Sequence, residues 1–411
     1  MNECWNYSRR DFLALSGGAA LSVVVAGPAQ TPPPTPAVTR KIKLGLIGCG
    51  GRGGWIAELF AKHGGYQLVA TADYFKSQAD RVGDKHGVAA DRRFAGLSAY
   101  QRLLASGVEA IAVESPPYFH PEQTAAGVAA GVHVYCAKPV AVDVPGCRNI
   151  AASGRQATAK KLCFRVDFQT RATDLFIEAL QRVHAGALGN LAFAEAIYHA
   201  DCPFTHHFDA LAKNPNDPEV RLRAWGLDRA LSGDIITEQN IHTLDVMNWV
   251  MQQPPVCATG TGGLLARAKI GTCFDHFTCL FDYGNGVGVT FSSRQINGHG
   301  TAPEGIRIRA FGSRGVLEAE YGGQVLIRGE DFFKGGKTPD IYEAGAAANV
   351  AAFYRDIIAG NTDNPTVEPS VQSNLITILG RTAAYTGQPV AWAKLVASAD
   401  RLEADLRGLK D

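Results

Sequence analysis

A glycine-rich turn constrains the fold of this chain more than any other feature. Gly48-Cys49-Gly50-Gly51-Arg52-Gly53 fits the pattern G-x-G-x-x-G, between a strand-length apolar run, Ile42 to Ile47, and a stretch of helical periodicity, Trp55 to Ala61. In such a unit the first glycine permits a tight turn, the second lets a pyrophosphate approach the backbone, and the third lets helix and strand pack closely. The turn predicts a dinucleotide site. The residues expected to hold the dinucleotide are Gly48, Gly50, Gly51, Arg52 and Gly53.

An acidic residue at the end of the next apolar run strengthens this prediction. Leu68 to Ala72 reads as a second strand, and it ends at Asp73, twenty residues after Gly53. A carboxylate there accepts hydrogen bonds from the adenosine ribose of NAD and repels the 2′-phosphate of NADP. We therefore expect NAD, with NADP possible because Lys76 is near. The alternative is that Asp73 only caps the following helix.

Strands and helices continue to alternate as far as Val166. This rhythm predicts a doubly wound parallel sheet of the Rossmann type over residues 42–166. The further strands are expected at 108–113, 132–136 and 161–166, with helices at 123–130 and 143–157. Ligands bind outside the carboxyl ends of such strands. The segments expected to line that crevice are 114–120, 137–139 and 166–171.

The rest of the chain, residues 167–411, loses this rhythm and predicts an α+β domain with an antiparallel sheet. Strands are expected at 191–199, 257–261, 273–283, 286–293, 305–311 and 315–319, and helices at 350–359 and 370–385. Cys273, His276 and Cys279 have a spacing that suggests metal ligands. In a strand, however, His276 points to the opposite face from both cysteines. We therefore assign no metal and expect most cysteines to be buried thiols.

The first residues have the pattern of an export signal. Arg9 and Arg10 precede an apolar run, Phe12 to Gly27, which resembles a twin-arginine signal peptide over residues 1–29. Sixteen residues at ~1.5 Å each span about 24 Å, short of the ~30 Å hydrocarbon core of a bilayer. Residues 30–41 form a proline-rich linker. We expect a periplasmic or otherwise exported protein, off the membrane once the signal is cleaved. The net charge of +1 gives no electrostatic case for nucleic acid.

Four motifs taken in order resemble the Gfo/Idh/MocA oxidoreductases, which include glucose–fructose oxidoreductase and inositol dehydrogenases. They are the glycine turn, "SPPYFH" at 115–120, "CAKPVAVD" at 136–143 and "GDIITEQNIHTLD" at 233–245. The resemblance covers roughly Lys41 to Trp392. It implies a Rossmann domain followed by a domain with a large open, mainly antiparallel sheet that commonly forms a subunit interface. We therefore expect a homo-oligomer, and we expect Pro116 and His120 to contact the cofactor.

The resemblance also assigns the chemistry. The usual Glu-Lys-Pro appears as Ala137-Lys138-Pro139, so Lys138 inherits a place beside the nicotinamide and the reacting carbon. His242 inherits the acid–base role, and Glu238 stands where an aspartate is usual. A spacing of four predicts that Glu238 and His242 share one face of a helix. The alternative is a surface lysine, a glutamate favouring the helix dipole and a core histidine.

Other polar residues are candidates for substrate contacts. The set comprises Gln169, Arg171 and Asp245, and with less support His206, His207 and Arg294. The predicted reaction is hydride transfer at a secondary hydroxyl of a sugar, sugar derivative or cyclitol. Free NAD is scarce outside the cytoplasm, so export predicts a tightly held cofactor. Two alternatives remain: an NAD-dependent glycosidase acting by transient oxidation and elimination, and a non-catalytic exported sugar-binding protein.

Overall fold

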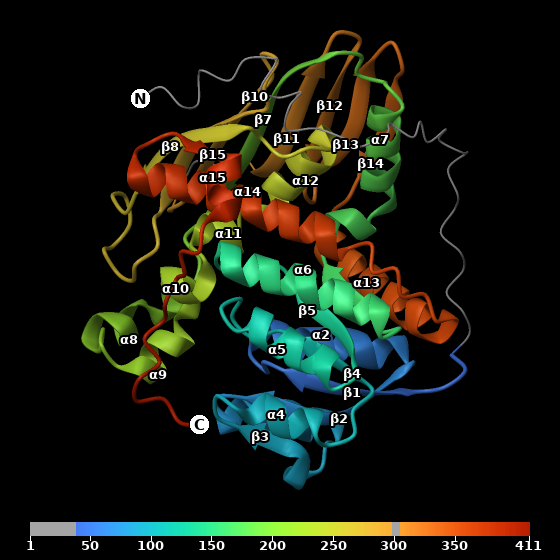
Figure 1. The fold of residues 1–411 in the computed structure, drawn as a ribbon, viewed down its shortest axis with the longest axis vertical. Helices are drawn as coiled ribbons and strands as arrows, with labels where there is room; N and C mark the ends of the chain where they lie inside the picture. The colour runs from blue at the N-terminus through green and yellow to red at the C-terminus, as the bar shows by residue number, and fades with distance from the viewer. Residues whose placement is uncertain (1–37, 298–304) are drawn as a thin grey trace.

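The computed structural model describes residues 38–297 and 305–411. The predicted signal peptide and most of the predicted linker lie outside the described residues. The last residues of that linker are anchored to the second half of the chain, because the Tyr354 hydroxyl accepts a hydrogen bond from Thr39 N (3.1 Å) and donates one to Arg40 O (2.9 Å). Two sheets, one parallel and one mainly antiparallel, confirm the predicted fold class (Figure 1).

The first sheet is parallel throughout, with the strand order β3-β2-β1-β4-β5-β6. Its strands are β1 (Ile42–Ile47), β2 (Tyr66–Asp73), β3 (Arg93–Ala95), β4 (Ala110–Val113), β5 (His133–Ala137) and β6 (Phe164–Asp167). This is the order of a dinucleotide-binding Rossmann sheet. Five of these strands agree with the prediction. The three-residue β3 is too short to leave a periodic signal.

Helices cover both faces of this sheet, which explains why its strands read as unbroken apolar runs. One face carries α4 (Ala99–Leu104), α5 (His120–Ala129) and α6 (Val144–Ala159), and the other carries α2 (Gly51–His63), α3 (Lys76–His86) and α13 (Ile341–Ala359). The last of these comes from far along the chain. Phe353 and Tyr354 on α13 are fully buried in the core formed by β1 and α2.

The second sheet has the order β14-β13-β12-β11-β7-β10-β9-β8-β15, and only β7 and β10 pair in parallel. Its strands are β7 (Leu191–Ala200), β8 (Cys257–Gly263), β9 (His276–Asp282), β10 (Gly288–Gln295), β11 (Gly305–Gly312), β12 (Gly315–Glu320), β13 (Gln324–Gly329), β14 (Phe333–Lys337) and β15 (Val390–Ala391). Burial alternates along β9 and β10, so one face packs on helices and the other is open. β13, β14 and β15 were not predicted.

The remaining helices follow β6 in the chain. They are α7 (Asp174–His184), α8 (Phe208–Lys213), α9 (Pro218–Arg223), α10 (Arg229–Ser232), α11 (Ile235–Glu238), α12 (Ile241–Met251), α14 (Val367–Thr386) and α15 (Trp392–Ala397), with the 3₁₀ turns η1 (Ala90–Arg92), η2 (Thr170–Ala172), η3 (Thr205–His207) and η4 (Trp225–Leu227). After α15 the chain runs in extended form down past α10 and α9 to the edge of the first sheet (Figure 1).

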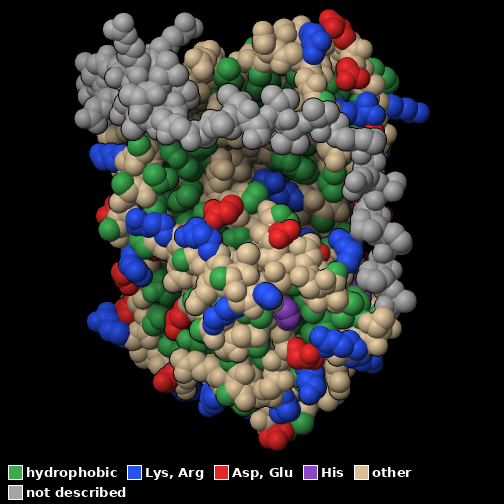
Figure 2. All heavy atoms as spheres, turned by 45° about the vertical axis from the view of Figure 1, so that its right-hand side comes forward, with side chains coloured by type: hydrophobic (Ala, Val, Ile, Leu, Met, Phe, Trp, Pro, Cys, Tyr) green, Lys and Arg blue, Asp and Glu red, His purple; other side chains and the backbone are tan. Residues whose placement is uncertain are grey.

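The cysteines agree with the sequence analysis. Cys49, Cys136, Cys147, Cys163, Cys273 and Cys279 are buried thiols, and half-buried His276 points away from Cys279 in β9. On the face drawn in Figure 2, basic and acidic side chains are interspersed rather than gathered by sign. Within residues 38–297 and 305–411, no helix is long and apolar enough to cross a bilayer.

Candidate functional site

The glycine turn has the geometry that a dinucleotide needs. Gly48 adopts φ +87°, and a Cβ there would lie 2.4 Å from Ser115 N. A Cβ on Gly53 would lie 1.9 Å from the carbonyl oxygen of Gly48, so α2 can approach β1 only with glycine at this position. A Cβ on Gly50 or Gly51 would meet nothing within 4 Å. The backbone at the start of α2 is therefore open to a phosphate.

Asp73 ends β2 and holds the turn as well as facing the crevice. Its Oδ2 accepts a hydrogen bond from Cys49 N (2.7 Å) and its Oδ1 accepts one from Phe75 N (2.8 Å). Burial raises the pKa of the Asp73 carboxyl, and these two hydrogen bonds oppose the rise. Each oxygen keeps a second lone pair for a ribose hydroxyl. Asp73 is therefore more than a helix cap, and its contact with the cofactor stays a prediction.

Arg52 is held by carboxylates beneath the crevice. Its Nε lies 3.0 Å from Oε2 of Glu114, and its Nη2 pairs with Asp167. Both acidic side chains are fully buried, at the ends of β4 and β6. Burial raises the pKa of Glu114 to about 7, although Arg52 opposes this. The sequence analysis singled out neither carboxylate, yet an acidic residue directly after a buried strand is a usable signal.

Lys138 follows β5 and reaches across to the second domain. Its Nζ donates a hydrogen bond to the backbone oxygen of Glu238 (2.7 Å) and lies 3.6 Å from the Glu238 Oε1. Only 8% of the side chain is exposed, and burial lowers the pKa of its ammonium group, with Glu238 opposing. These contacts exclude a surface lysine and place the ammonium between the two domains.

His242 is the second residue of α12, four residues after Glu238. Its ring is 5.1 Å from the ring of Tyr321 and 6.4 Å from that of Phe168. Its Nδ1 is buried and has no hydrogen-bond partner. Burial, followed by the charges of Lys138 and Arg52, lowers the pKa of His242 well below its ordinary value. The imidazole is therefore neutral near pH 7 and able to accept a proton.

The prediction that Glu238 and His242 share one helix is wrong. Glu238 is the last residue of α11, and α12 begins at Ile241. The helix ends here because the backbone N–H groups of Gln239 and Asn240 both donate to Ile235 O (2.9 Å each), which interrupts the regular series of helical hydrogen bonds. Spacing alone cannot reveal such a break. Glu238 still comes close to Lys138, through the end of α11.

Unpartnered polar groups lie buried between the domains. Neither polar atom of the Gln169 side chain has a hydrogen-bond partner, and the same holds for Asn240 and for the hydroxyl of Thr170. Buried polar groups normally have partners. These atoms therefore fit a polar ligand, and Gln169 remains a candidate for contact with the substrate.

Arg171 and Asp245 bind each other instead. Arg171 Nε donates to Oδ1 (2.9 Å) and Oδ2 (3.0 Å) of Asp245, and Ser373 Oγ donates to Oδ1 (2.7 Å). Asp245 is fully buried. Because protein groups surround Asp245, we correct its role from substrate contact to positioning of α12, whereas contact of Arg171 with the substrate stays a prediction.

His120 braces two loops of the crevice. Its Nδ1 lies 2.8 Å from Pro139 O, and its Nε2 lies 2.7 Å from Ser115 O. Burial lowers the pKa of His120 to about 4, so the ring is neutral and its single N–H donates to one of these two carbonyl oxygens. This links the loop after β4, which contains Pro116, to the loop that carries Lys138. His120 is 1% exposed, and it acts through these loops.

The three weaker candidates lie apart from these groups. The rings of His206 and His207 lie tilted to each other with centroids 4.0 Å apart, in η3 before α8. Arg294 donates to Ile296 O (3.0 Å) near the end of β10. Among the described residues, no group of three histidine, cysteine or acidic side chains could hold a metal ion.

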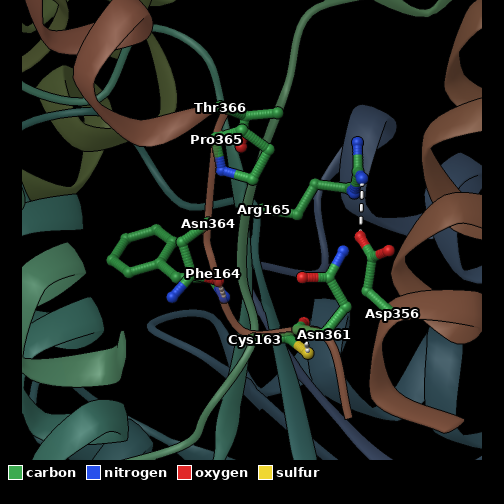
Figure 3. A pocket seen from close by; sticks show the side chains of 8 residues that line it. All are labelled: Cys163, Phe164, Arg165, Asp356, Asn361, Asn364, Pro365 and Thr366. Carbon is green, nitrogen blue, oxygen red and sulfur yellow. Dashed lines mark hydrogen bonds and ion pairs between the residues drawn. The ribbon is translucent and has the colours of Figure 1, made fainter. Parts of the chain in front are cut away.

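Two small cavities lie in different places relative to the crevice. One, of about 180 Å³, is lined by His242, Thr170, Thr243 and Tyr321 together with apolar side chains. The other, of about 220 Å³, lies at the amino end of β6, where Arg165 pairs with Asp356 (2.7 Å; Figure 3). Ligands of this fold bind at the carboxyl ends of the strands, so only the first cavity belongs to the site.

Comparison with known proteins identifies the family. Residues 42–167 match the family described as "Oxidoreductase family, NAD-binding Rossmann fold", and residues 176–318 match "GFO/IDH/MocA C-terminal domain". The chain belongs to the Gfo/Idh/MocA family. The predicted enzyme class, an NAD-dependent oxidoreductase acting on CH–OH groups, is thereby confirmed, and so is NAD as the cofactor of the Rossmann domain.

Individual relatives of this Gfo/Idh/MocA protein are distant. A myo-inositol dehydrogenase, Hyg17, from Streptomyces leeuwenhoekii is 27% identical over 67% of this chain and 75% of its own length. An inositol 2-dehydrogenase from Rhizobium meliloti (strain 1021) is 22% identical over 68% and 76%. The crystal structure of GenD2 from gentamicin A biosynthesis, in complex with NAD, superposes with a TM-score of 0.68. The two chains are 16% identical, and the match covers 88% of this chain and 99% of that one. At that identity the structure shows the shared fold.

The residues around the turn generate a test of the cofactor site. We expect Asp73→Ala to weaken NAD binding by about tenfold or more and to reduce the preference for NAD over NADP, because the change removes ribose hydrogen bonds and the repulsion of a 2′-phosphate together. Titration of both cofactors measures this. Asp84→Ala, which removes an exposed carboxylate farther along α3, is the control. An unchanged preference between the cofactors would show that Asp73 only braces the turn.

Proposed function

We propose that this protein is an exported NAD-dependent oxidoreductase that transfers hydride at a secondary hydroxyl of a sugar, sugar derivative or cyclitol. The observation that carries the proposal is the buried Lys138 ammonium, which Glu238 holds at the end of α11, together with the buried and unpartnered Nδ1 of His242 at the start of α12. The names of the relatives, inositol dehydrogenases among them, support a polyol substrate. The unpartnered polar atoms of Gln169 and Asn240 suit a molecule with many hydroxyl groups.

Different residues bind the cofactor, transfer the proton and stabilise the alkoxide. The glycine turn and Asp73 would hold NAD, which when bound supplies the hydride acceptor. His242 takes the proton of the substrate hydroxyl as general base. Lys138 donates a hydrogen bond to the same oxygen, and its charge stabilises the alkoxide that develops there. In the reverse direction His242 returns the proton.

Glu238 orients Lys138, and the charge of Lys138 in turn acts on His242. The carbonyl and carboxylate of Glu238 fix the Lys138 ammonium, so it needs no reorientation during the reaction. The Lys138 charge helps to keep His242 unprotonated. We therefore expect the acid limb of the oxidation rate to lie below the ordinary histidine pKa of ~6.5, since the base stays neutral until the pH falls through its lowered pKa.

Export and cofactor retention extend the proposal. The paired arginines Arg9 and Arg10 support a twin-arginine signal, a route for folded proteins. A cofactor that travels with the enzyme must return to its starting state in every cycle. Coupled oxidation of one sugar and reduction of another would achieve this.

The second candidate, a glycosidase, also restores its cofactor. Transient oxidation of a hydroxyl acidifies the neighbouring C–H bond, elimination then expels the aglycone, and water addition followed by reduction restores the sugar. The Glu238 carboxylate beside Lys138 favours keeping this candidate, because a carboxylate can move the proton of the elimination step. A binding protein without catalysis has weaker support, since Lys138 and His242 occupy a constrained geometry.

The open face of the second sheet supports a homo-oligomer. Phe193 of β7 is 44% exposed and stacks on Phe311 of β11, with ring centroids 4.5 Å apart, and Leu280 of β9 is 40% exposed. Exposed apolar side chains grouped on one surface commonly mark an interface. A single species of monomer mass in sedimentation velocity would contradict this assembly.

A substrate panel tests the reaction. Free sugars, cyclitols and aryl glycosides are supplied to the purified enzyme, and nicotinamide absorbance and released aglycone are followed together. An oxidoreductase gives a change in nicotinamide absorbance with a free sugar or cyclitol. Aglycone release with no net change would favour the glycosidase. Bound nucleotide without either signal on a broad panel would favour the binding protein.

Substitution of the acid–base pair tests the mechanism. We expect Lys138→Ala and His242→Ala each to slow substrate oxidation by about 10² or more, the loss typical of a positioned acid–base group. NAD binding should change little, because neither residue belongs to the glycine turn. His206→Ala, on the loop before α8, is the control. A loss below threefold in either variant, measured at saturating substrate, would remove that residue from the mechanism.

Export is tested in the producing cell. We expect Arg9→Lys combined with Arg10→Lys to block export, because lysine keeps the charge but not the planar guanidinium. The wild-type protein recovered from the periplasm should carry NAD(H), detectable by mass spectrometry after denaturation. Normal export of the double variant would point to the general secretory route, and empty wild-type protein would remove cofactor retention.

A further inference from the structure

We infer that residues 398–411, the strap segment, act with α9 as a clasp over the adenosine half of the dinucleotide and slow its exchange. The inference rests on the proposed function only in taking NAD as the ligand of the crevice. Neither element belongs to the Rossmann domain in sequence. Both reach it from the second half of the chain (Figure 1).

The strap segment first contacts the loops after β5 and β4. Arg148 on α6 donates to Ser398 O, and Leu402 N donates to Asp143 Oδ2 (3.0 Å). Asp143 also caps α6 through Gly146 N (2.7 Å). Farther along, the backbone of Ala404 hydrogen-bonds the Tyr118 hydroxyl. The segment is thus fixed on one side of the glycine turn.

Its far end contacts the loops after β2 and β3. Leu97 N donates to Lys410 O (3.1 Å), and Lys410 N donates to the hydroxyl of Tyr74 (3.1 Å). Tyr74 directly follows Asp73, the residue expected to bind the adenosine ribose. A Cβ on Gly96 would lie 2.5 Å from the backbone of Asp411. The segment is thus fixed on the other side of the turn as well.

α9 reinforces this far end from the outside. The Tyr74 hydroxyl donates to Glu219 Oε1 (2.9 Å), and the Arg223 guanidinium lies 3.6 Å from the centre of the Phe75 ring. Lys410 Nζ lies 3.6 Å from the same Glu219 oxygen. Tyr74 is therefore the point at which the Rossmann domain, α9 and the strap segment meet.

The strand order shows that the strap segment crosses the carboxyl end of β1. β1, which carries the glycine turn, lies between β2 and β4. A segment bonded to the loops after β5 and β4 and also to those after β2 and β3 must pass across the carboxyl end of β1. A dinucleotide binds at this end. Its adenosine half lies beside Asp73 and cannot leave past Tyr74 while the strap segment is in place.

The strap segment can both pack against the protein and detach from it locally. Leu402, Ala404 and Leu406 are half-buried, whereas Glu403, Asp405 and Arg407 between them are exposed. This alternation gives an extended chain one face toward the protein. It has no regular secondary structure, and its contacts are few. Such segments open locally while the domain stays folded.

The experiment measures NADH release directly. Protein loaded with NADH is mixed with excess NAD, and the decay of NADH fluorescence gives the release rate. We expect a chain ending at Asp400 to release NADH at least tenfold faster than the full chain. Two full-length variants, Leu406→Asp and Tyr74→Phe, should accelerate release in the same direction, because each loosens the clasp without removing the segment.

An outward-facing residue of the strap segment provides a matched control for the release experiment. Asp405 and Arg407 bond to each other on the outward face, and the Arg407 side chain is 91% exposed. Arg407→Ala should leave the release rate unchanged. Thermal melting of every variant separates loss of the clasp from loss of the fold.

Two results would overturn the inference. Unchanged release in the shortened chain and in Leu406→Asp, both with wild-type melting, would show that the segment does not restrain the cofactor. Slower release or tighter binding after shortening would show that it occupies the site. Neither result bears on the proposed reaction, which the substrate panel tests separately. Faster release without turnover on that panel would support the clasp and contradict the proposed reaction.

Discussion

A ladder of buried polar side chains on α14 fixes the geometry of the site. Asn374 Oδ1 accepts from Val140 N (3.0 Å) and Ala141 N (3.3 Å), which holds the loop after Lys138. One turn along, Thr377 Oγ1 donates to Thr237 Oγ1 (3.0 Å) on α11. Ser373 Oγ donates to Asp245 on α12 (2.7 Å). A single rigid helix therefore sets the relative positions of three segments, and each broken bond would leave a buried polar group unpaired.

Buried ion pairs also fix the geometry of the site. Arg52 and Lys138 lie with Glu114, Asp167 and Glu238 in a region nearly closed to water. Removing one member would leave its partner charged and unpaired in that region, which is more costly than losing an exposed ion pair. The site is therefore organised before any ligand arrives. Fixed charges and dipoles of this kind stabilise a developing alkoxide without reorganisation.

The sequence was sufficient wherever a local constraint decides the structure. Strands covered on both faces must be apolar throughout, so β1, β4 and β5 were visible, and the close approach at Gly48 and Gly53 admits glycine alone. The misses depend on contacts between distant residues. The break after Glu238 and the closed pair of Arg171 and Asp245 are decided by partners that periodicity does not reveal.

Distance along the chain also explains the order in which the site can form. The turn at residues 48–53 opens the crevice, α9 at 218–223 reaches its outer edge, and residues 398–411 cross it last. A dinucleotide bound by the turn alone would meet only part of its site. The crossing needs α14 and α15 in place, because the segment follows them in the chain and starts beside them (Figure 1). The clasp that we infer is thus a property of the completed fold rather than of the Rossmann domain alone.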